Sequence, residues 1–472
     1  MQLQKLQRRD IPSLNRFYSV QNTRISDYSA GFAFMWGEDL DTHYDIVEDC
    51  LVLCDSYDGD RYFYWPLSAD NDIDKELKAL DAIEQYCRTN YIRLRFTSVP
   101  ADRLHFLVER YGADMSISNS RRWRDYLYNA EDFINYPGKK YSGQRNHVNR
   151  FLRQYPNYTF ETFRHEDLQD VLRFLGDVAT VQAKKGTDIA LTEMRGVSEI
   201  LPYLDSLGLF GAVLRVDGNV AGFSVGEVCG DTMIVHIEKA LRSVDGAYPM
   251  LAQQFAKKYA TSVKYINRED DAGDIGLRKS KMQYLPVSIV DKFTVEVRNA
   301  MHNIVRYPAI KTSRLKIGKI KQEDVTTFAR LARDGSLNKY WGYDWTVKAG
   351  CDNPPDSWFL NDVYQDFKNK QELPLAIYYD NTLAGEVVLH NFGYRSEAEI
   401  GMRVLPEYQH KGIAREALIA TMQYAFTRLN IEKVEAKCFK ENTTSAYTLK
   451  SAGMKQAGED DTYLHFYKTA EM

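Results

Sequence analysis

Residues Ala398–Leu418 read AEIGMRVLPEYQHKGIAREAL, a pattern typical of a strand, a short turn and the start of a helix. The strand is predicted over Ala398–Val404, and apolar residues at helical spacing predict a helix that begins near Ala414. The turn between them, Gln409–Ala414, contains a single glycine, Gly412. Backbone N–H groups at the start of a helix lack helical partners, and the helix dipole adds positive charge there. This turn is therefore predicted to hold a phosphate group.

The hairpin before this strand occurs twice in the chain. Val213–Glu227, VLRVDGNVAGFSVGE, aligns with Ala376–His390, AIYYDNTLAGEVVLH, at an offset of 163 residues (376 minus 213). Each segment reads as two strands joined by a two-residue turn, predicted at Gly218-Asn219 and at Asn381-Thr382. The strand and helix that follow recur at the same offset, which predicts a repeated unit of hairpin, strand, helix, strand and helix.

A degenerate further copy of this unit is predicted in the first 135 residues. A helix is expected over Asp72–Asn90, a strand over Tyr91–Val99 and a second helix over Ala101–Ala113. Turn-rich, basic residues at 135–146 and a polar connector at 306–319 mark the boundaries between copies. We therefore expect an α/β (α+β) chain of three similar copies, each a mixed, mostly antiparallel sheet flanked by helices, over residues 1–135, 136–306 and 307–472.

Composition argues against several classes of protein. The net charge of −4 provides no general basic field to attract nucleic acid or an anionic membrane. No stretch approaches the roughly 18 uncharged apolar residues of a membrane span, so no transmembrane segment is expected. The six cysteines form no C-x-x-C pair and the nine histidines show no metal-ligand spacing. We therefore expect reduced thiols, no metal and a cytoplasmic location.

Two motifs after residue 400 resemble those of the GNAT acetyltransferases. The spacing Gln409-x-x-Gly412-x-Ala414 is similar to the pyrophosphate loop Q/R-x-x-G-x-G/A of that family, at the same strand–helix junction. The segment NTTSAYTLKSAGM, Asn442–Met454, is similar to the family's N-x-x-S helix start followed by a Gly-aromatic pair. The resemblance covers residues 314–472. Within the family, the segment is most similar to the branch that acetylates N-termini of ribosomal and other proteins and related amines.

This resemblance implies acetyl-CoA, or another acyl-CoA, as co-substrate. Its arm would lie between splayed strands at Ala398–Val404 and Lys433–Phe439, with a backbone N–H near Val404 polarising the thioester carbonyl. Asn442 and Ser445 would contact the arm or order the helix start. The acceptor would be a primary amine of a small molecule, peptide or protein that attacks the thioester directly. The pyrophosphate would rest on Gln409, His410, Lys411, Gly412, Ile413 and Ala414.

Two catalytic roles are also implied by the resemblance. A base must take a proton from the amine, and Glu399 is the first candidate, with Glu386 and Glu397 as alternatives. Many family members carry a tyrosine four residues before the glycine of the Gly-aromatic pair, where this chain has Leu449. Tyr447, two residues earlier, is the candidate acid, and the alternative is that no side-chain acid is used.

Four aromatic residues crowd into NKYWGYDW, Asn338–Trp345. The pattern fits packing in a core or lid. It also fits one wall of the acceptor site, because this region flanks the acceptor in the GNAT family.

Motifs in the first three hundred residues resemble the C-terminal domain of phosphatidylglycerol lysyltransferases. From Ser29 to Val297 the motifs G-K-K, R-N-x-x-N-x-F, H-x-E-K-A, N-R-E-D-D-x-G and G-L-R-K-x-K occur in the family order. That domain is itself a tandem pair of GNAT folds, which agrees with the repeat. The candidate site residues of this module are Arg145, Asn146, His236, Glu238, Lys239, Asn267, Arg268 and Arg278.

Three interpretations of the whole chain are open. The preferred one is an acetyl-CoA-dependent N-acetyltransferase domain whose tandem module recognises the acceptor or performs a second acyl or aminoacyl transfer. The second makes aminoacyl-tRNA-dependent transfer by the tandem module the main activity. The third makes that module a non-enzymatic recognition domain. Lipid-modifying members carry a multi-span membrane region that these residues lack, which disfavours a lipid acceptor, and the acidic charge disfavours tRNA. The turn at Arg242–Pro249 lacks the pyrophosphate pattern, so acetyl-CoA is expected in the third copy.

Overall fold

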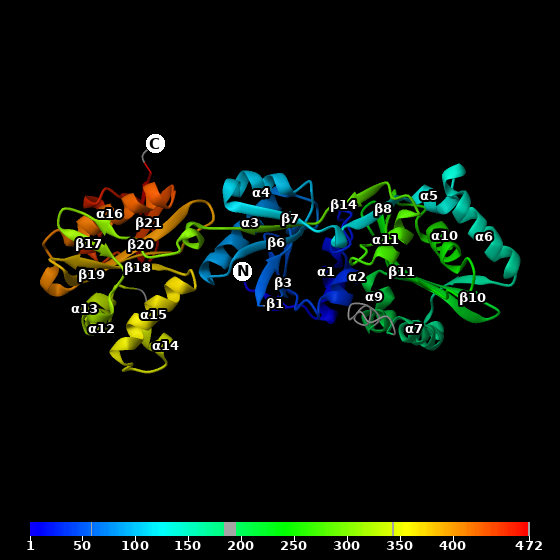
Figure 1. The fold of residues 1–472 in the computed structure, drawn as a ribbon, viewed down its shortest axis with the longest axis horizontal. Helices are drawn as coiled ribbons and strands as arrows, with labels where there is room; N and C mark the ends of the chain where they lie inside the picture. The colour runs from blue at the N-terminus through cyan, green and yellow to red at the C-terminus, as the bar shows by residue number, and fades with distance from the viewer. Residues whose placement is uncertain (58, 184–194, 342–343, 471–472) are drawn as a thin grey trace. The chain divides into compact units, whose positions relative to one another are not determined.

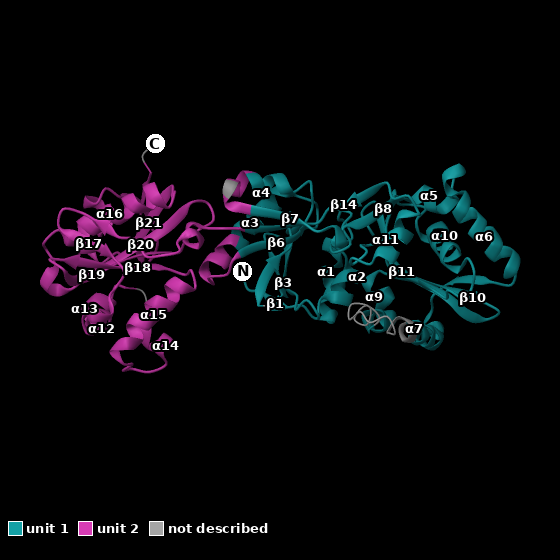
Figure 2. Cartoon of the chain, viewed as in Figure 1, with its two compact units in different colours: residues 1–83, 94–108, 116–296 teal, residues 84–93, 109–115, 297–472 magenta. Residues whose placement is uncertain are grey.

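The computed structural model describes residues 1–57, 59–183, 195–341 and 344–470. The chain divides into two compact units (Figure 2). Unit 1 comprises residues 1–83, 94–108 and 116–296, and unit 2 comprises residues 84–93, 109–115 and 297–472. The described residues form three sheets with helices packed on them, which confirms the mixed α/β class (Figure 1). Across the described ranges, no helix is both long and apolar enough to cross a membrane.

The first sheet has the strand order β1-β2-β3-β4-β6-β15-β7, with β5 paired to β3. Its strands are β1 (Gln4–Lys5), β2 (His43–Val47), β3 (Cys50–Tyr57), β4 (Asp60–Phe63), β5 (Leu67–Ser68), β6 (Leu94–Val99), β7 (Met115–Asn119) and β15 (Phe293–Val297). Its helices are α1 (Ile11–Tyr18), α2 (Ala30–Trp36), α3 (Ile73–Thr89) and α4 (Leu104–Tyr111). The predicted helix, strand and helix over residues 72–113 are confirmed as α3, β6 and α4.

The second sheet has the order β14-β8-β13-β12-β11-β10-β9. Its strands are β8 (Asp125–Asn129), β9 (Thr159–Thr162), β10 (Phe210–Val216), β11 (Asn219–Cys229), β12 (Thr232–Ala240), β13 (Tyr265–Asn267) and β14 (Ser288–Val290). Its helices are α5 (Ala130–Asn135), α6 (Ser142–Gln154), α7 (Leu168–Ala183), α9 (Leu204–Leu207), α10 (Ala247–Tyr259) and α11 (Ile275–Met282). Strand β8 precedes the boundary predicted at 135/136, and β15 returns to the first sheet. The boundaries at 135/136 and 306/307 stay predictions.

The third sheet has the order β16-β17-β18-β19-β20-β21-β23-β22. Its strands are β16 (Ile310–Lys311), β17 (Leu315–Gly318), β18 (Leu373–Tyr379), β19 (Thr382–His390), β20 (Glu397–Val404), β21 (Lys433–Phe439), β22 (Lys455–Glu459) and β23 (Tyr463–Thr469). Its helices are α12 (Val325–Arg333), α13 (Gly335–Asn338), α14 (Trp345–Ala349), α15 (Asp356–Lys368), α16 (Ile413–Arg428) and α17 (Thr443–Ser451). The predicted order of hairpin, strand, helix, strand and helix is confirmed.

The repeat holds at the level of single residues. Strands β10 and β18 begin at Phe210 and Leu373, an offset of 163 (373 minus 210), and β11 and β19 keep that offset. Both hairpins also shift register at equivalent places, after Leu214 and after Ile377. The predicted turn pairs are one residue too late, because the strands end at Val216 and Tyr379. The left-handed residues are Asp217, Gly218, Asp380 and Asn381, as a two-residue hairpin turn requires.

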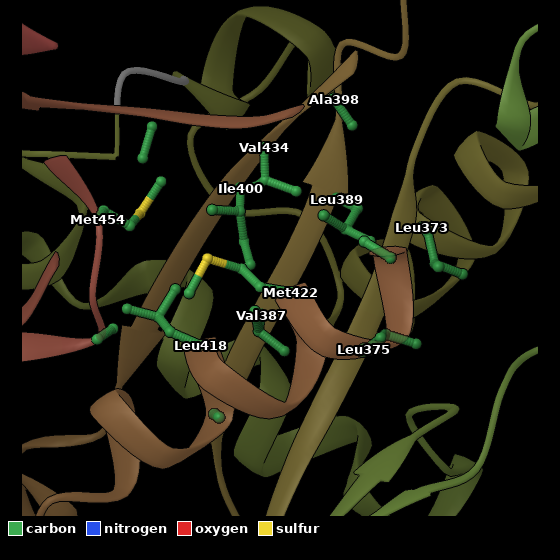
Figure 3. Close-up of a cluster of buried hydrophobic side chains, with 14 of the residues drawn as sticks. Leu373, Leu375, Val387, Leu389, Ala398, Ile400, Leu418, Met422, Val434 and Met454 are labelled. Atoms are coloured by element: carbon green, nitrogen blue, oxygen red, sulfur yellow. The ribbon is translucent and has the colours of Figure 1, made fainter. Parts of the chain in front are cut away.

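The two faces of the third sheet carry different apolar clusters, and strand β20 is apolar on one face and polar on the other. Leu389, Ile400, Leu418, Met422 and Val434 pack together where β19, β20 and β21 meet α16 (Figure 3). Because side chains alternate along a strand, residues 399, 401 and 403 of β20 face the opposite side of the sheet. On that side a second apolar cluster is built around α12 and α15. The polar residues of β20 thus project beside α12 and α15 rather than into the α16 core.

Truncation of Leu418 tests the importance of the α16 core. Leu418 is fully buried and Ile419 beside it is only partly buried. Leu418→Ala is expected to lower the free energy of opening of β19 and β20 by about 2–5 kcal/mol, through lost burial and the cavity left behind. Native-state hydrogen exchange of the β19 amides measures this loss. Ile419→Ala is the matched control, and an equal loss in both variants would show that α16 does not pack as described.

Candidate active site

Strand β20 has two unlike edges. Along one edge it pairs with β19 continuously from Glu399 to Val404. Along the other it pairs in parallel with β21 at only three positions, the last of which joins Glu399 to Glu435. Strand β21 instead pairs with β23 over all of Lys433–Phe439. In the part of the chain that the structure describes, no strand pairs with the β21-facing edge of Ile400–Val404.

This open edge presents backbone hydrogen-bonding groups. The N–H of Leu405 donates to the carbonyl of Ala384 at 2.9 Å, so these two residues form a hydrogen-bonded pair between β20 and β19. Hydrogen-bonded and non-hydrogen-bonded pairs alternate in an antiparallel sheet. The N–H groups of Val404 and Met402 therefore point away from β19, where an extended ligand along the edge can reach them.

The turn after β20 exposes the amides of a helix start. Helix α16 begins with Ile413–Ala414, its N-cap is Gly412 at φ +75°, and no side chain caps this end. His410 also has a positive φ, +59°. A Cβ at Gly412 would be no closer than 3.5 Å to its nearest neighbour, the Arg314 guanidinium, and Lys411 Nζ donates to an upstream backbone carbonyl at 2.8 Å. Uncapped N–H groups beside open space suit an anion, as predicted for this turn.

Side chains from both sides hold the turn in place. Gln409 Nε2 donates to the carbonyl of Val404 at 3.0 Å and ties the turn to the end of β20. Arg314 donates to the carbonyl of Lys411 at 3.0 Å and to the Glu416 carboxylate at 2.8 Å. Sequence patterns did not reveal Arg314, because these partners lie 97 and 102 positions later in the chain.

A groove of about 1380 Å³ runs along α16 beside the turn. Residues 300 and 303–314 form one side, and α16 from Gly412 onwards forms the other. Its charged lining residues are Arg306, Lys311, Arg314, Arg415 and Arg428, with Glu416 as the carboxylate. Glu386, Glu399 and Tyr447 do not line it. The groove therefore adjoins the turn, whereas the predicted catalytic residues lie elsewhere.

Glu399 is a buried carboxylate on the polar face of β20. Asn391 Nδ2 donates to it at 2.8 Å, and Lys437 Nζ lies 3.3 Å from its other oxygen. Burial opposes its charged form, but His390, Asn391 and Lys437 outweigh burial and hold the pKa of Glu399 below its usual value. Glu399 is therefore ionised at neutral pH, as the predicted base must be. Its catalytic role stays a prediction.

Glu386 is engaged in a buried ion pair. Two nitrogens of Arg403 lie 2.9 Å from the same Glu386 oxygen, and the side chains are 2% and 9% exposed. Arg403 also donates to Asn338 at 2.8 Å and lies over the Trp341 ring at 4.5 Å. Burial raises the pKa of Glu386, and Arg403 opposes this rise. Glu386 thus lies in an ion pair, and its role as a base stays a prediction.

His390 is a further ionisable side chain on this face, and sequence patterns did not single it out. It stands directly opposite Glu399 in the β19–β20 pairing. Its Nε2 lies 3.7 Å, and Cη2 of Trp341 lies 3.6 Å, from the place that a Cβ would occupy at Gly401. The two rings thus flank the bare backbone of Gly401. The sequence contained one indication of this residue, because the two aligned hairpin segments end in ionisable residues, His390 and its counterpart Glu227.

The other predicted residues of the third copy lie at α17 and in the aromatic segment. Asn442 accepts a hydrogen bond from the N–H of Ser445 at 3.1 Å and caps α17. Tyr447 is 75% exposed on that helix, and its role as an acid stays a prediction. Of the segment NKYWGYDW, Asn338 and Trp341 contact Arg403, while residues 342–343 lie outside the described residues.

In the second copy, His236 bridges two carboxylates. Its two ring nitrogens lie 2.8 Å from oxygens of Glu227 and Glu269, and its side chain is fully buried. The N–H of Gly31, in α2, also donates to Glu227 at 2.7 Å. Burial opposes protonation of the ring, but the two carboxylates outweigh it and raise the pKa of His236 to about 10. The charged ring therefore helps to join the first and second copies.

The polar and charged groups of the N-R-E-D-D turn are bound by other residues of the second copy. Lys281 Nζ donates to three successive carbonyls, those of Arg268–Asp270. Arg278 donates twice to Asp271, at 2.8 Å each, and the Arg268 side chain pairs with Glu238. The family motif in this region thus builds a rigid turn whose charged groups largely bind one another.

The predicted residues of the tandem module fall into two groups. His236, Glu238, Asn267, Arg268 and Arg278 come together around β12, β13 and α11. Asn267 is buried and donates to Asp125 at 2.8 Å. Arg145 and Asn146 lie apart on α6, where Arg145 binds the carbonyls of Tyr136 and Gly138, and Lys239 lies on β12. Within the described ranges, no three His, Cys, Asp or Glu side chains gather in a way that could hold a metal ion.

The turn before α10 has the same glycine N-cap as the turn before α16, but neighbouring residues fill the space beside it. Gly246 is an N-cap at φ +80°, like its counterpart in the third copy. A Cβ at Gly246 would lie 2.6 Å from the carbonyl oxygen of His147 and 3.0 Å from Cβ of Phe151, both on α6. Arg150 of the same helix pairs with Asp245 at 3.0 Å. Helix α6 therefore covers the side from which a phosphate would approach.

Two family models match the sequence. The model described as "Phosphatidylglycerol lysyltransferase, C-terminal" matches residues 19–296, more than half of the chain. The model described as "Acetyltransferase (GNAT) domain" matches residues 314–455. Both resemblances inferred from the motifs are thereby confirmed.

Relatives and a solved structure resemble parts of the chain. The N-acetyltransferase YnaD of Bacillus subtilis (strain 168) is 29% identical over 150 residues, which is 32% of this chain and 84% of that protein. Spermidine N(1)-acetyltransferase of Escherichia coli (strain K12) is 27% identical over 148 residues, 31% of this chain and 75% of that protein. The structure of a conserved protein from Bacteroides thetaiotaomicron VPI-5482 superposes with a TM-score of 0.59 at 26% identity, covering 63% of this chain and 99% of that chain.

The Glu386–Arg403 pair yields a prediction about stability. Arg403→Met leaves a buried carboxylate unpaired and is expected to lower the free energy of unfolding by about 3–5 kcal/mol. Replacing both charges, in Glu386→Leu with Arg403→Met, is expected to recover most of that loss. Urea unfolding followed by circular dichroism measures both variants. An equally large loss in the double variant would contradict the pairing.

The charged His236 yields a prediction about pH. Because its folded-state pKa of about 10 exceeds the ordinary value of 6.5, its contribution to stability is complete below pH 6.5. The contribution declines as pH rises and is lost above about pH 10. The difference in Tm between wild type and His236→Gln should therefore narrow from pH 6 to pH 10. His165→Gln, at an exposed position, is the control, and a constant difference across this range would rule out the charged bridge.

Proposed function

Because this chain belongs to the family of the phosphatidylglycerol lysyltransferase C-terminal domain and carries a GNAT acetyltransferase domain, we propose that its third copy transfers an acetyl group from acetyl-CoA to a primary amine. One observation carries the proposal. The open edge of β20 is followed directly by an uncapped helix start at Gly412. An extended thioester arm needs backbone partners and a pyrophosphate needs unpaired N–H groups, and this segment supplies both in the required order.

The proposed pose of acetyl-CoA follows from these two features. Its pyrophosphate would rest on the amides of Gln409–Ala414, with Arg314 and Lys411 adding positive charge. Its arm would run along the open edge of Ile400–Val404, where the outward N–H groups near Val404, including that of Met402, can bind the arm and polarise the thioester carbonyl. Asn442 and Ser445, at the start of α17, would lie beside the arm. Another acyl-CoA with a small acyl group would use the same contacts.

The proposed reaction is direct attack by the amine. Its nitrogen bonds to the thioester carbonyl carbon, the C–S bond breaks, and CoA leaves as a thiol once its sulfur takes a proton. A base must first remove a proton from the ammonium form of the acceptor. The buried carboxylate of Glu399 gives the polar face of β20 a group that attracts a cationic amine. The acceptor is therefore a primary amine of a small molecule, a peptide or a protein.

The tandem module is proposed to recognise the acceptor or to perform a second acyl or aminoacyl transfer. The filled turn at Gly246 supports a role without CoA. The match to a lysyltransferase family supports a second transfer. Aminoacyl-tRNA-dependent transfer as the main activity is the competing proposal, and one feature favours it. Residues 138–153 contain five Lys or Arg and no Asp or Glu. Salt-sensitive binding of aminoacyl-tRNA to the chain would support that alternative.

Titration with acetyl-CoA tests the proposed donor. Isothermal calorimetry of the full chain is expected to find one molecule bound per chain, because the turn of the second copy is covered. Gly412→Glu is expected to weaken binding about 100-fold or more, since a carboxylate repels the pyrophosphate and φ +75° strains any side chain.

Gly458→Glu is the matched control for this titration. It adds the same charge in the same sheet, on β22, where a Cβ meets nothing within 4 Å. Its affinity for acetyl-CoA should equal that of the wild type. Absence of saturable binding, or equal affinity in Gly412→Glu, would refute the proposed donor site.

A further inference from the structure

The polar face of β20 contains two ionisable groups that face each other across strands. His390 ends β19, and Glu399 stands opposite it on β20, at the position where pairing with β21 stops. The open edge begins with the next residue, Ile400. Both side chains therefore lie at the point where an extended ligand on that edge would present its reactive end to the polar face.

Gly401 leaves the strand backbone bare beside the His390 ring. A Cβ atom at Gly401 would lie 3.7 Å from Nε2 of His390 and 3.6 Å from Cη2 of Trp341. Both distances are ordinary van der Waals contacts, so the gap between the two rings can hold one carbon atom. Gly401 itself leaves that place empty. The edge of the Trp341 ring system and the Nε2 of His390 thus border a position directly above the strand backbone, two residues after Glu399.

The surroundings of His390 favour a neutral ring that can accept a proton during the reaction. Burial lowers the pKa of His390 below its usual value, and Lys437 and Arg88 act in the same direction. Glu399 acts in the opposite direction and favours the protonated ring. The ring is therefore neutral at neutral pH, and a carboxylate is at hand to stabilise the imidazolium once a proton arrives.

The other candidates for the base are less suited by their contacts. Glu386 shares its oxygen with two nitrogens of Arg403. Glu399 is held by Asn391 and Lys437. Both carboxylates are thus occupied by donors, whereas Nε2 of His390 lies beside the bare backbone of Gly401.

We propose that His390 is the catalytic base of the third copy and that Glu399 is its positioning residue. This role rests on the proposed acetyl transfer. Neutral His390 takes one proton from the ammonium group of the acceptor and becomes an imidazolium beside Glu399. The free amine attacks the thioester carbon, and its second proton passes to the departing CoA sulfur. Products are the acetylated amine, CoA thiol and a protonated His390, which returns its proton to water.

Steady-state kinetics with defined probes test this role. Acetyl-CoA is supplied with spermidine or with a short peptide that has a free α-amine, and acetylated product is quantified by mass spectrometry. His390→Gln is expected to lower kcat about 100-fold while the affinity for acetyl-CoA stays within twofold. His465→Gln, which removes an exposed histidine of β23 in the same sheet, should leave kcat unchanged. An unchanged kcat in His390→Gln overturns the proposal.

The pH profile separates the base from its positioning residue. In the wild type, kcat should fall at acid pH as His390 becomes protonated. This fall, the acid limb of the pH profile, should be absent in His390→Gln. Glu399→Gln should keep the limb but move it to lower pH, because the carboxylate no longer stabilises the imidazolium. A limb that disappears in Glu399→Gln and persists in His390→Gln would make Glu399 the base and overturn the assignment.

A measurement without substrate distinguishes failure of the His390 assignment from failure of the proposed acetyl transfer. The ¹H–¹⁵N spectrum of the imidazole rings in the free chain should show His390 titrating below pH 6.5, and lower still in Glu399→Gln. A His390 that titrates above pH 6.5 overturns its role as base even where acetyl transfer is found. A chain that binds no acetyl-CoA refutes the proposed function itself.

Discussion

The early end of the pairing between β20 and β21 is the constraint on which the third copy depends. Strand β20 is held along one edge by β19, while β21 is committed to β23, so three residues of parallel ladder are all that join them. Beyond Glu399, no strand among the described residues pairs with the second edge of β20. The strand stays in place because its apolar side chains pack under α16, and the ion pair of Glu386 with Arg403 secures its polar face. The uncapped helix start at Gly412 then follows where the strand ends.

The second copy keeps this frame and fills the spaces that the frame creates. Strands β12 and β13 also share three parallel pairs, which end at Ile234 and Asn267. Helix α6 covers Gly246, and α2 places its first amides on Glu227. The two copies therefore have similar backbones but differ in whether the turn before the helix is covered or exposed. The charged bridge through His236 and the closed N-R-E-D-D turn stabilise the module, and the third copy keeps an exposed, uncapped turn at Gly412.

Much of the fold could be predicted from the sequence, because short-range rules decide it. Both hairpins were located by the alternation of apolar residues, the Asp- and Asn-containing turns and the offset of 163 residues. The predicted turn pairs were displaced by one residue, because Asp217 rather than Asn219 adopts the left-handed conformation. The spacing of Gln409, Gly412 and Ala414 located the turn before α16, because it too is a short-range pattern.

The remainder of the site depends on contacts across strands, which a single sequence does not reveal. His390 stands opposite Glu399 only through the register of β19 on β20, and Arg314 reaches the turn from the bend between β16 and β17. The pairing of Glu386 with Arg403 and the exposure of Tyr447 likewise come from packing. Residue type identified the candidate carboxylates, and tertiary structure showed that Glu386 pairs with Arg403 whereas Glu399 lies opposite His390.

Hydrogen–deuterium exchange with and without acetyl-CoA tests most directly whether the third copy alone takes the donor along its open edge. The account predicts slower exchange of the amides in Ile400–Val404 and Gln409–Ala414. It predicts no change in the corresponding segment of the second copy, residues 232–247. Slower exchange at 242–247, or none at Gln409–Ala414, would contradict it.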